Sequence, residues 1–225
     1  MLKKFVYLVV IVLSQQICIN GDCDGADNLQ KLNCECKNLN SEVTCYGYEN
    51  SFTINSPEWD QFESDNNLIE LSFGQNFDYL PFHMFSNLTN LELFKMWRLK
   101  VTTIPSSSFK NMKYLREVWI YNNDVTTVQR YAFVNLPELK EVSLYWNKIT
   151  ELDAESFSGV PNLETINLSW NQISEIPRGF FDNLFSLKKI YFEYNQLKYL
   201  DLQLMAPIIP NFLRKDSILQ LYGKK

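Results

Sequence analysis

Residues 115–138 read LREVWIYNNDVTTVQRYAFVNLPE, and the next 24 residues, LKEVSLYWNKITELDAESFSGVPN, place similar side chains at the same offsets. Two further rows, LETINLSWNQISEIPRGFFDNLFS and LKKIYFEYNQLKYLDLQLMAPIIP, continue the pattern to residue 210. Similarity at a fixed period predicts a repeat architecture, because one coil cannot bury its apolar face alone and each neighbour supplies the cover.

Several columns of the repeat keep one kind of side chain. The apolar columns are Val118, Val142, Ile166 and Ile190; Ile120, Leu144, Leu168 and Phe192; and Val125, Ile149, Ile173 and Leu197. Asparagine holds the column Asn123, Asn147, Asn171 and Asn195. A phenylalanine recurs every 24 residues at Phe85, Phe109, Phe133, Phe157 and Phe181, and Met205 follows it.

Two earlier rows extend the array to six. The row beginning at Leu91 keeps the apolar frame but has Leu99 where the asparagine should be. The row beginning at Leu68 is one residue shorter, and we align its Leu71 and Phe73 with the first two strand positions of the other rows.

These registered positions resemble the extracellular leucine-rich repeat, LxxLxLxxNxLxxLxxxxFxxLxx, over roughly residues 68–208. The resemblance implies an α/β repeat fold, a leucine-rich repeat solenoid or horseshoe. It would have short parallel strands on its concave face and irregular or 3₁₀ turns on its convex face. We expect the asparagines to bond backbone groups left unpaired at the strand ends, and the phenylalanines to stack along the opposite wall.

The amino-terminal residues predict export. Lys3 and Lys4 precede the apolar run FVYLVVIVL and the polar segment SQQICING, which is typical of a secretory signal peptide at residues 1–21. An uncleaved anchor is the alternative, but the apolar run is too short to span a bilayer. Cleavage changes the formal charge from −5 to −7, and nucleic acid is then an unlikely partner because phosphate binding needs a basic face. We expect a secreted, extracellular protein with no membrane span.

Four cysteines remain after cleavage, Cys23, Cys34, Cys36 and Cys45. An even number in an exported chain predicts a disulfide framework, and spacing alone leaves three pairings open. A zinc site is the competing interpretation, but the Cys-x-Cys spacing and the distance to the only histidine, His83, argue against a metal. We expect no cofactor.

The ends of the array are predicted to be capped. Residues 22–67 resemble the cysteine-bearing amino-terminal cap of the family with a first irregular coil, and this resemblance implies the pairs Cys23–Cys36 and Cys34–Cys45. Six repeats would fill residues 68–208. Residues 209–225 depart from the family because no cysteine follows Cys45. They predict a non-cysteine cap or tail, with a dimerisation surface or docking strand as the alternative, so a homodimer through the carboxyl-terminal end is also considered.

One face of the predicted strands carries large aromatic side chains. Alternation sends Val118 and Ile120 inward and Glu117, Trp119 and Tyr121 to the concave face. Equivalent residues of successive rows should lie about 4.8 Å apart across the sheet. The columns read Gly74, Trp97, Tyr121, Tyr145, Ser169 and Glu193; Gln75, Arg98, Asn122, Trp146, Trp170 and Tyr194; and Ser72, Lys95, Trp119, Ser143, Asn167 and Tyr191.

This wall is the predicted partner-binding surface. Partial exposure of its rings would give a patch of roughly 400 to 700 Å², a size that usually indicates contact. Tryptophan and tyrosine are enriched in binding hot spots, although the rings could instead stack and merely stiffen the sheet. The predicted residues are Trp97, Trp119, Tyr121, Tyr145, Trp146, Trp170, Tyr191 and Tyr194, with Glu117, Glu141, Lys95, Arg98 and Lys189 setting orientation.

Two sequons predict glycosylation, NLT at Asn87 and NLS at Asn167. The first would sit on an exposed turn. Asn167 projects from the concave wall, and a sugar there would push a partner toward Trp97 and Tyr145. Asn167 is as readily left unmodified.

The chain is predicted not to be an enzyme. Its single histidine leaves no Ser-His-Asp or Cys-His arrangement. Glu117 and Glu141 could in principle act as acid and base on a sugar, but neighbouring acids are common in adjacent repeats.

The predicted function is extracellular recognition of a protein ligand or cell-surface receptor, in innate immunity or in receptor–ligand modulation. The resemblance extends weakly to insect leucine-rich immune proteins, which usually carry further cysteines and a coiled-coil tail that this chain lacks. The alternative is a structural matrix component that binds collagen-like or carbohydrate surfaces.

Overall fold

The computed structural model describes residues 88, 90–213 and 215–221 in full. Before them it describes only the backbone of the strands β1 (Cys18–Ile19), β2 (Asp22–Cys23), β3 (Leu32–Lys37), β4 (Glu42–Gly47) and β5 (Leu68–Phe73). The later strands of the main sheet are β6 (Leu93–Trp97), β9 (Glu117–Tyr121), β12 (Glu141–Ser143), β15 (Thr165–Asn167), β16 (Lys189–Tyr191) and β17 (Ile218–Gln220).

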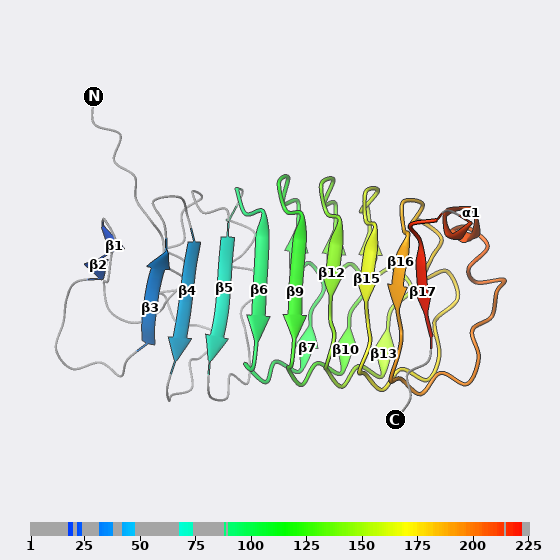
Figure 1. The fold of residues 1–225 in the computed structure, drawn as a ribbon, viewed down its shortest axis with the longest axis horizontal. Helices are drawn as coiled ribbons and strands as arrows, with labels where there is room; N and C mark the ends of the chain where they lie inside the picture. The colour runs from blue at the N-terminus through cyan, green and yellow to red at the C-terminus, as the bar shows by residue number, and fades with distance from the viewer. Residues whose placement is uncertain are drawn as a thin grey trace.

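Nine of these strands form one sheet in the order β17-β16-β15-β12-β9-β6-β5-β4-β3 (Figure 1). Every neighbouring pair is parallel except β3 with β4. From β6 to β16 the register follows the 24-residue period, so that Val118 lies opposite Phe94 on one side and Val142 on the other. Each turn of the chain therefore adds one strand, which makes the molecule a parallel β-solenoid.

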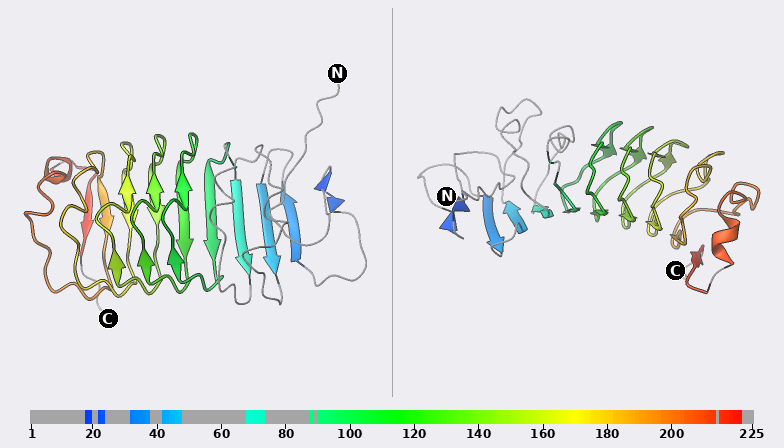
Figure 2. Two further views of the ribbon diagram at one scale, coloured as in Figure 1. Left: turned by 180° about the vertical axis from the view of Figure 1, so that it is seen from behind. Right: turned by 90° about the horizontal axis from the view of Figure 1, so that it is seen from above.

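The other side of each coil is built from very short strands and turns (Figure 2). One three-stranded parallel sheet joins β7 (Thr103–Ile104), β10 (Thr127–Val128) and β13 (Glu151–Leu152). A second joins β8 (Phe109–Lys110), β11 (Phe133–Val134) and β14 (Phe157–Ser158).

Helix is scarce, and the α/β class expected from the sequence is not confirmed. The one helix among the described residues is α1 (Ile209–Phe212), which has four residues. No 3₁₀ turn occurs between residues 90 and 213. No helix in the described part of the chain has the length and apolar character that a membrane crossing would require.

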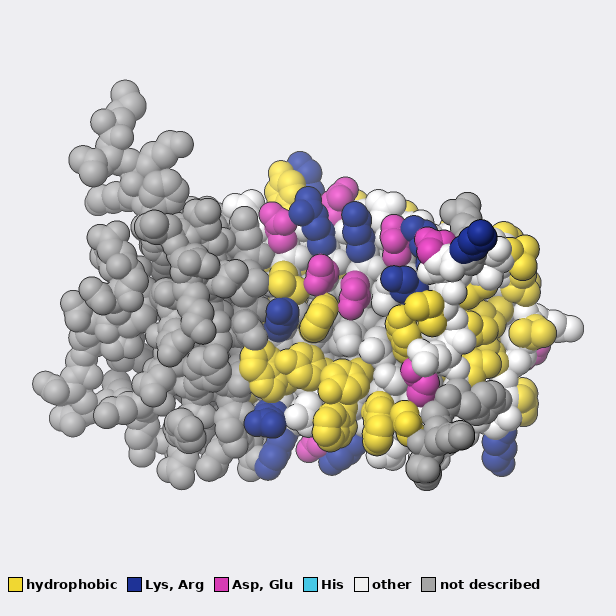
Figure 3. Space-filling model, viewed as in Figure 1, with side chains coloured by type: hydrophobic (Ala, Val, Ile, Leu, Met, Phe, Trp, Pro, Cys, Tyr) yellow, Lys and Arg dark blue, Asp and Glu magenta, His cyan; other side chains and the backbone are white. Residues whose placement is uncertain are grey.

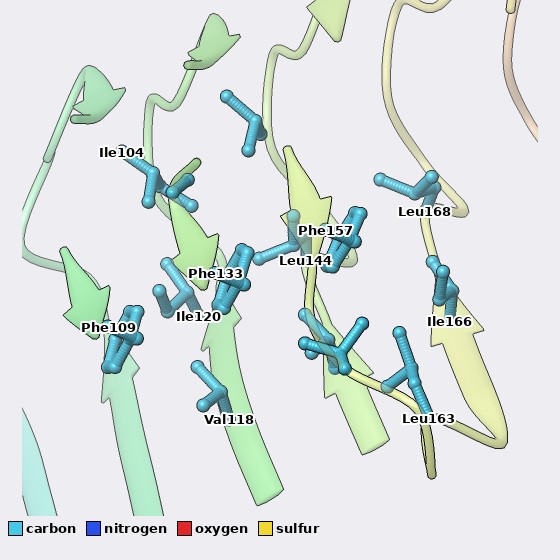
Figure 4. Packing of buried hydrophobic residues seen from close by; sticks show 14 of the residues in the cluster. Ile104, Phe109, Val118, Ile120, Phe133, Leu144, Phe157, Leu163, Ile166 and Leu168 are labelled. Carbon is cyan, nitrogen blue, oxygen red and sulfur yellow. The ribbon is translucent and has the colours of Figure 1, made fainter. Parts of the chain in front are cut away.

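The core lies between the main sheet and the short strands. Alternation in β9 buries Val118 and Ile120 completely. On the opposite wall, Phe133 stacks between Phe109 and Phe157, with ring centroids 5.2 and 4.9 Å apart and nearly parallel planes (Figure 4). The predicted phenylalanine column is confirmed for these three coils. In the next coil, Phe180 meets Phe157 edge-on and Phe181 is buried beside it.

The asparagines of the repeat column bond the backbone between coils, as predicted. Asn147 Oδ1 accepts a hydrogen bond from the backbone N–H of Val125 at 3.3 Å, and its Nδ2 donates to the carbonyls of Ile120 and Leu144 at 2.8 and 3.0 Å. Equivalent bonds are made by Asn123, Asn171 and Asn195. Each asparagine thus pairs groups that the strand ends would leave unsatisfied.

The register of the row beginning at Leu68 differs from the predicted one by two residues. Ser72, and not Gly74, lies opposite Trp97, and Leu71 lies opposite Met96 rather than Phe94. The predicted column for Ser72 was therefore wrong, as was the prediction of Gly74 opposite Trp97, while the column predicted for Gln75 lies outside the described residues. A slip of two residues keeps every side chain on the same face, so the apolar alternation of β5 could not distinguish the two registers.

Several predictions fall on residues outside the fully described part. The strand register places Cys34 opposite Cys45, but the side chains of the predicted pairs Cys23–Cys36 and Cys34–Cys45 are not described. The signal peptide at residues 1–21, except for part of its backbone, and Asn87 also lie outside. At the carboxyl end, residues 209–225 contribute α1 and the last strand of the sheet, β17.

Candidate functional site

The outward side chains of β6, β9, β12, β15 and β16, with the residues just after each strand, form a surface that we call the sheet face. Figure 3 views this face and shows hydrophobic side chains gathered in a band across the described strands, with charged side chains on both sides of it. The register confirms the predicted column Lys95, Trp119, Ser143, Asn167 and Tyr191. It places Glu117 opposite Glu141, and Thr165 and Lys189 continue their column.

Six aromatic rings form one continuous line, which we call the aromatic strip. Trp97 stacks on Tyr121 with ring centroids 5.6 Å apart, and Tyr121 stacks on Tyr145 at 5.7 Å. At Tyr145 the line passes to the next column, which holds Trp146, Trp170 and Tyr194. It continues through the pairs Tyr145–Trp146, Trp146–Trp170 and Trp170–Tyr194, at 6.0, 6.2 and 4.0 Å.

Stacking does not hide these rings from solvent. Trp146 remains 54% exposed and Trp170 50% exposed, and the other four rings of the strip are partly exposed. The alternative hypothesis predicted that the rings stack across strands, and the structure contains these contacts. This hypothesis leaves the exposed halves of the Trp146 and Trp170 indoles without a structural role.

Two of the three tryptophans of the strip also occupy an unfavourable backbone conformation. Trp146 and Trp170 have φ angles of 56° and 55°, in the left-handed region. This region costs an ordinary L-residue roughly 1 to 2 kcal/mol, and glycine and asparagine adopt it most readily. Another left-handed column of the same solenoid uses the favoured types, Asn111, Asn135 and Gly159. The column of Trp146 and Trp170 also holds Arg98, Asn122 and Tyr194 in this conformation, so four of its five residues are of types that adopt it at a cost in stability.

Trp119 lies beside the strip, in the column of Lys95 and Ser143. The Lys95 Nζ lies 5.2 Å from the centroid of its ring, a cation–π contact. The indole Nε1 is buried and has no hydrogen-bond acceptor among the described residues. Tyr191 lies in the same column on β16; burial raises the pKa of its phenol, and the nearby Glu193 and Glu141 raise it further.

Two carboxylates face each other on the sheet face. Glu117 and Glu141 are register partners on β9 and β12, and both are half-buried. Burial raises the pKa of the Glu141 carboxyl, Glu117 raises it further, and Lys189 acts in the opposite direction. Arg98, the remaining predicted charge, is exposed after β6.

Asn167 lies on the sheet face, as predicted. Its Oδ1 accepts hydrogen bonds from the backbone N–H of Ser169 at 3.0 Å and from the Ser169 hydroxyl at 2.5 Å. The Asn167 side chain is thus hydrogen-bonded to the serine of its own sequon. Its glycosylation stays a prediction.

Sequence reasoning found these columns because they follow from periodicity. It missed the left-handed backbone at residues 146 and 170. The signal for it was present, since this column holds Asn122 in the preceding coil, and asparagine is the non-glycine residue that tolerates this conformation best.

The repeats match a family model described as a BspA type leucine rich repeat region, in six copies over residues 34–133 and 97–204. The chain belongs to this leucine-rich repeat family. No curated protein sequence matches it significantly.

Several solved complexes contain a chain of similar fold. A TLR13–ssRNA13 complex aligns with a TM-score of 0.60 and 25% identity, over 68% of this chain and 21% of that chain. The Drosophila Toll–Spatzle complex aligns at 0.59 and 20% identity, over 73% and 27%. Its glycosylated form aligns at 0.61 and 22% identity, over 72% and 22%. This chain thus spans about a fifth to a quarter of those chains.

Proposed function

We propose that this leucine-rich repeat protein is a secreted, non-catalytic recognition protein whose aromatic strip binds an extracellular protein ligand or receptor. The sheet face would then be the concave wall of a horseshoe. The observation that carries the proposal is the pair Trp146 and Trp170, half-exposed and held in a backbone conformation that costs stability.

The strip has the properties of a binding hot spot. Tryptophan and tyrosine dominate hot spots because a large ring buries much area at small cost in side-chain entropy. In the strip each ring is also held by its neighbours, so that little freedom remains to be lost on binding. These contacts favour a preformed surface for a partner.

The class of partner is inferred from charge. The structures of similar fold contain a protein ligand in one case and single-stranded RNA in the other, so the fold alone does not decide. This chain carries a net charge of −5, which opposes binding to phosphate backbones. A protein ligand is therefore favoured, in innate immunity or receptor–ligand modulation.

Replacing the two exposed tryptophans tests the proposal. Trp146→Asn with Trp170→Asn removes the indoles and keeps a residue that accepts the left-handed backbone, as Asn122 does in the same column. Wild-type protein immobilised on a resin should retain a defined partner from extracellular fluid, and the double variant should not. The matched control is Phe185→Ala, which removes a 63% exposed ring from a turn away from the sheet face.

If the double variant retains the same partner as the wild type, the aromatic strip is not the binding site. A structural matrix role makes a different prediction. Wild-type protein would then bind immobilised collagen or spots on a glycan array, and would retain no defined protein ligand.

We also propose that two copies can pair through the carboxyl-terminal end. Leu219 of β17 continues the column of Ile190, yet it is 37% exposed while Ile190 is fully buried. β17 is the last strand of the sheet, and an uncovered apolar edge strand favours pairing with another strand.

A further inference from the structure

The sheet face contains a local excess of negative charge beside the aromatic strip. Glu117 and Glu141 lie opposite each other on neighbouring parallel strands, about 4.8 Å apart. Both side chains point to the same face as Trp119 and Tyr121, because they occupy the same alternation in the sheet.

No ion pair neutralises this excess within the described part of the molecule, although Lys189 offsets it in part. Neither Glu117 nor Glu141 has a lysine or arginine nitrogen within 4.0 Å among the described residues. Lys95 is engaged with the ring of Trp119. Lys189 lies in the same column as the two glutamates, but Thr165 separates it from Glu141.

This arrangement opposes folding. Like charges directly opposite each other on a sheet destabilise it, and half-burial adds a desolvation cost. Elsewhere the solenoid pairs opposite charges between coils, as in Arg116 with Glu92 and Lys188 with Glu164. The acid pair departs from that rule at the place where the face is most aromatic.

We propose that the partner places a cationic side chain, an arginine or a lysine, between Glu117 and Glu141 beside Trp119, while apolar residues of the same segment cover the aromatic strip. A guanidinium suits this place because it can bond both carboxylates and lie against an indole face. This inference rests on the proposed function, and it adds the chemistry of the ligand.

The spacing lets one short segment make both contacts. Glu117 and Tyr121 are four residues apart on β9, which is about 13 Å along an extended strand. Four or five extended residues of the partner would cover that distance. The negative charge of the whole chain, −5, would also speed association with a basic partner.

Selection from a random peptide library displayed on phage tests the inference without a known partner. The protein is immobilised in three forms: wild type, Glu117→Gln with Glu141→Gln, and Trp146→Asn with Trp170→Asn. A fourth form, Glu151→Gln with Glu175→Gln, is the matched control. It removes two exposed carboxylates that are also 24 residues apart, one on β13 and one in the next coil.

The wild type and the control should enrich peptides with an arginine or lysine next to aromatic or aliphatic residues. The glutamine pair should lose the cationic preference and keep the apolar one. A synthetic peptide from the wild-type selection should bind the glutamine pair about tenfold more weakly at low salt, and the control as well as the wild type.

The outcomes separate the two proposals. This inference is overturned if the wild type enriches apolar peptides without an arginine or lysine. It is also overturned if the glutamine pair shows the same cationic enrichment as the wild type. Either result leaves the proposed function standing. If wild type and the tryptophan variant enrich the same peptides, or neither enriches any, the proposed function fails and this inference fails with it.

Discussion

Trp146 and Trp170 have φ values near 55°, where asparagine or glycine would be less strained, and each exposes half of its indole to solvent. Their neighbours in the chain are the buried asparagines Asn147 and Asn171, which are held by several backbone hydrogen bonds. Those bonds fix the turn, and the turn imposes the left-handed backbone on the residue before it. The tryptophans are thus held in place by neighbouring interactions.

Loss of one asparagine should be costly because its backbone partners are buried. Asn147→Ala leaves the Val125 N–H and the Ile120 carbonyl without their bonds, and we expect the free energy of unfolding to fall by about 3 kcal/mol. Urea denaturation followed by circular dichroism measures this. Asn162→Ala, which removes an exposed bond to the Pro137 carbonyl, should cost less than about 1 kcal/mol. Equal losses of stability in the two variants would refute the structural role of the asparagine column.

Stability should depend on pH through Glu141. Its folded-state pKa is raised above the ordinary 4.5, first by burial and then by Glu117, so ionisation disfavours the folded state as the pH rises through that pKa. Glu141→Gln should be more stable than wild type at pH 7, by up to about 1 kcal/mol. The difference should vanish below about pH 4, where the carboxyl is protonated in both states. Urea titrations at the two pH values test this, and a variant less stable at pH 7 would contradict it.

At the scale of the strand and the coil, the sequence predicted most of what the structure contains. A 24-residue period assigns every position of a coil to a face, so the columns of Trp97, Trp119 and Glu117 were predictable. The register of β5 was not, because a slip of two residues leaves the alternation unchanged. The column change between Tyr145 and Trp146 depends on ring contacts that periodicity does not contain.

On the wall opposite the main sheet, substitutions in the phenylalanine column should lower the stability most. Phe133 is fully buried and stacked on both sides, so Phe133→Ala should create a cavity and lower the free energy of unfolding by about 3 to 5 kcal/mol. Phe185→Ala, at an exposed ring, should change it by less than about 0.5 kcal/mol. Thermal unfolding of both variants checks this. A small effect at Phe133 would mean that the coils do not share one packed wall.

The whole molecule is a stack in which each inner coil is covered by a neighbour on both sides. A terminal coil has a neighbour on one side only. The pairing proposed at β17 predicts a concentration-dependent dimer in sedimentation equilibrium. Leu219→Glu should abolish it, because a charge would then occupy the exposed apolar edge. A wild-type protein that stays monomeric up to about 100 µM would contradict the pairing, since even weak specific dimers form at such concentrations.

We propose that the aromatic strip serves binding at the expense of stability, so partner affinity and unfolding free energy should change separately in one variant. The most direct test is the dissociation constant of the partner captured by wild type, measured by calorimetry for wild type and for Trp146→Asn with Trp170→Asn. We predict binding at least about 30-fold weaker, since one hot spot is worth about 2 kcal/mol, with unfolding free energy equal to or above wild type. An unchanged dissociation constant, or weaker binding that merely accompanies unfolding, would contradict the account.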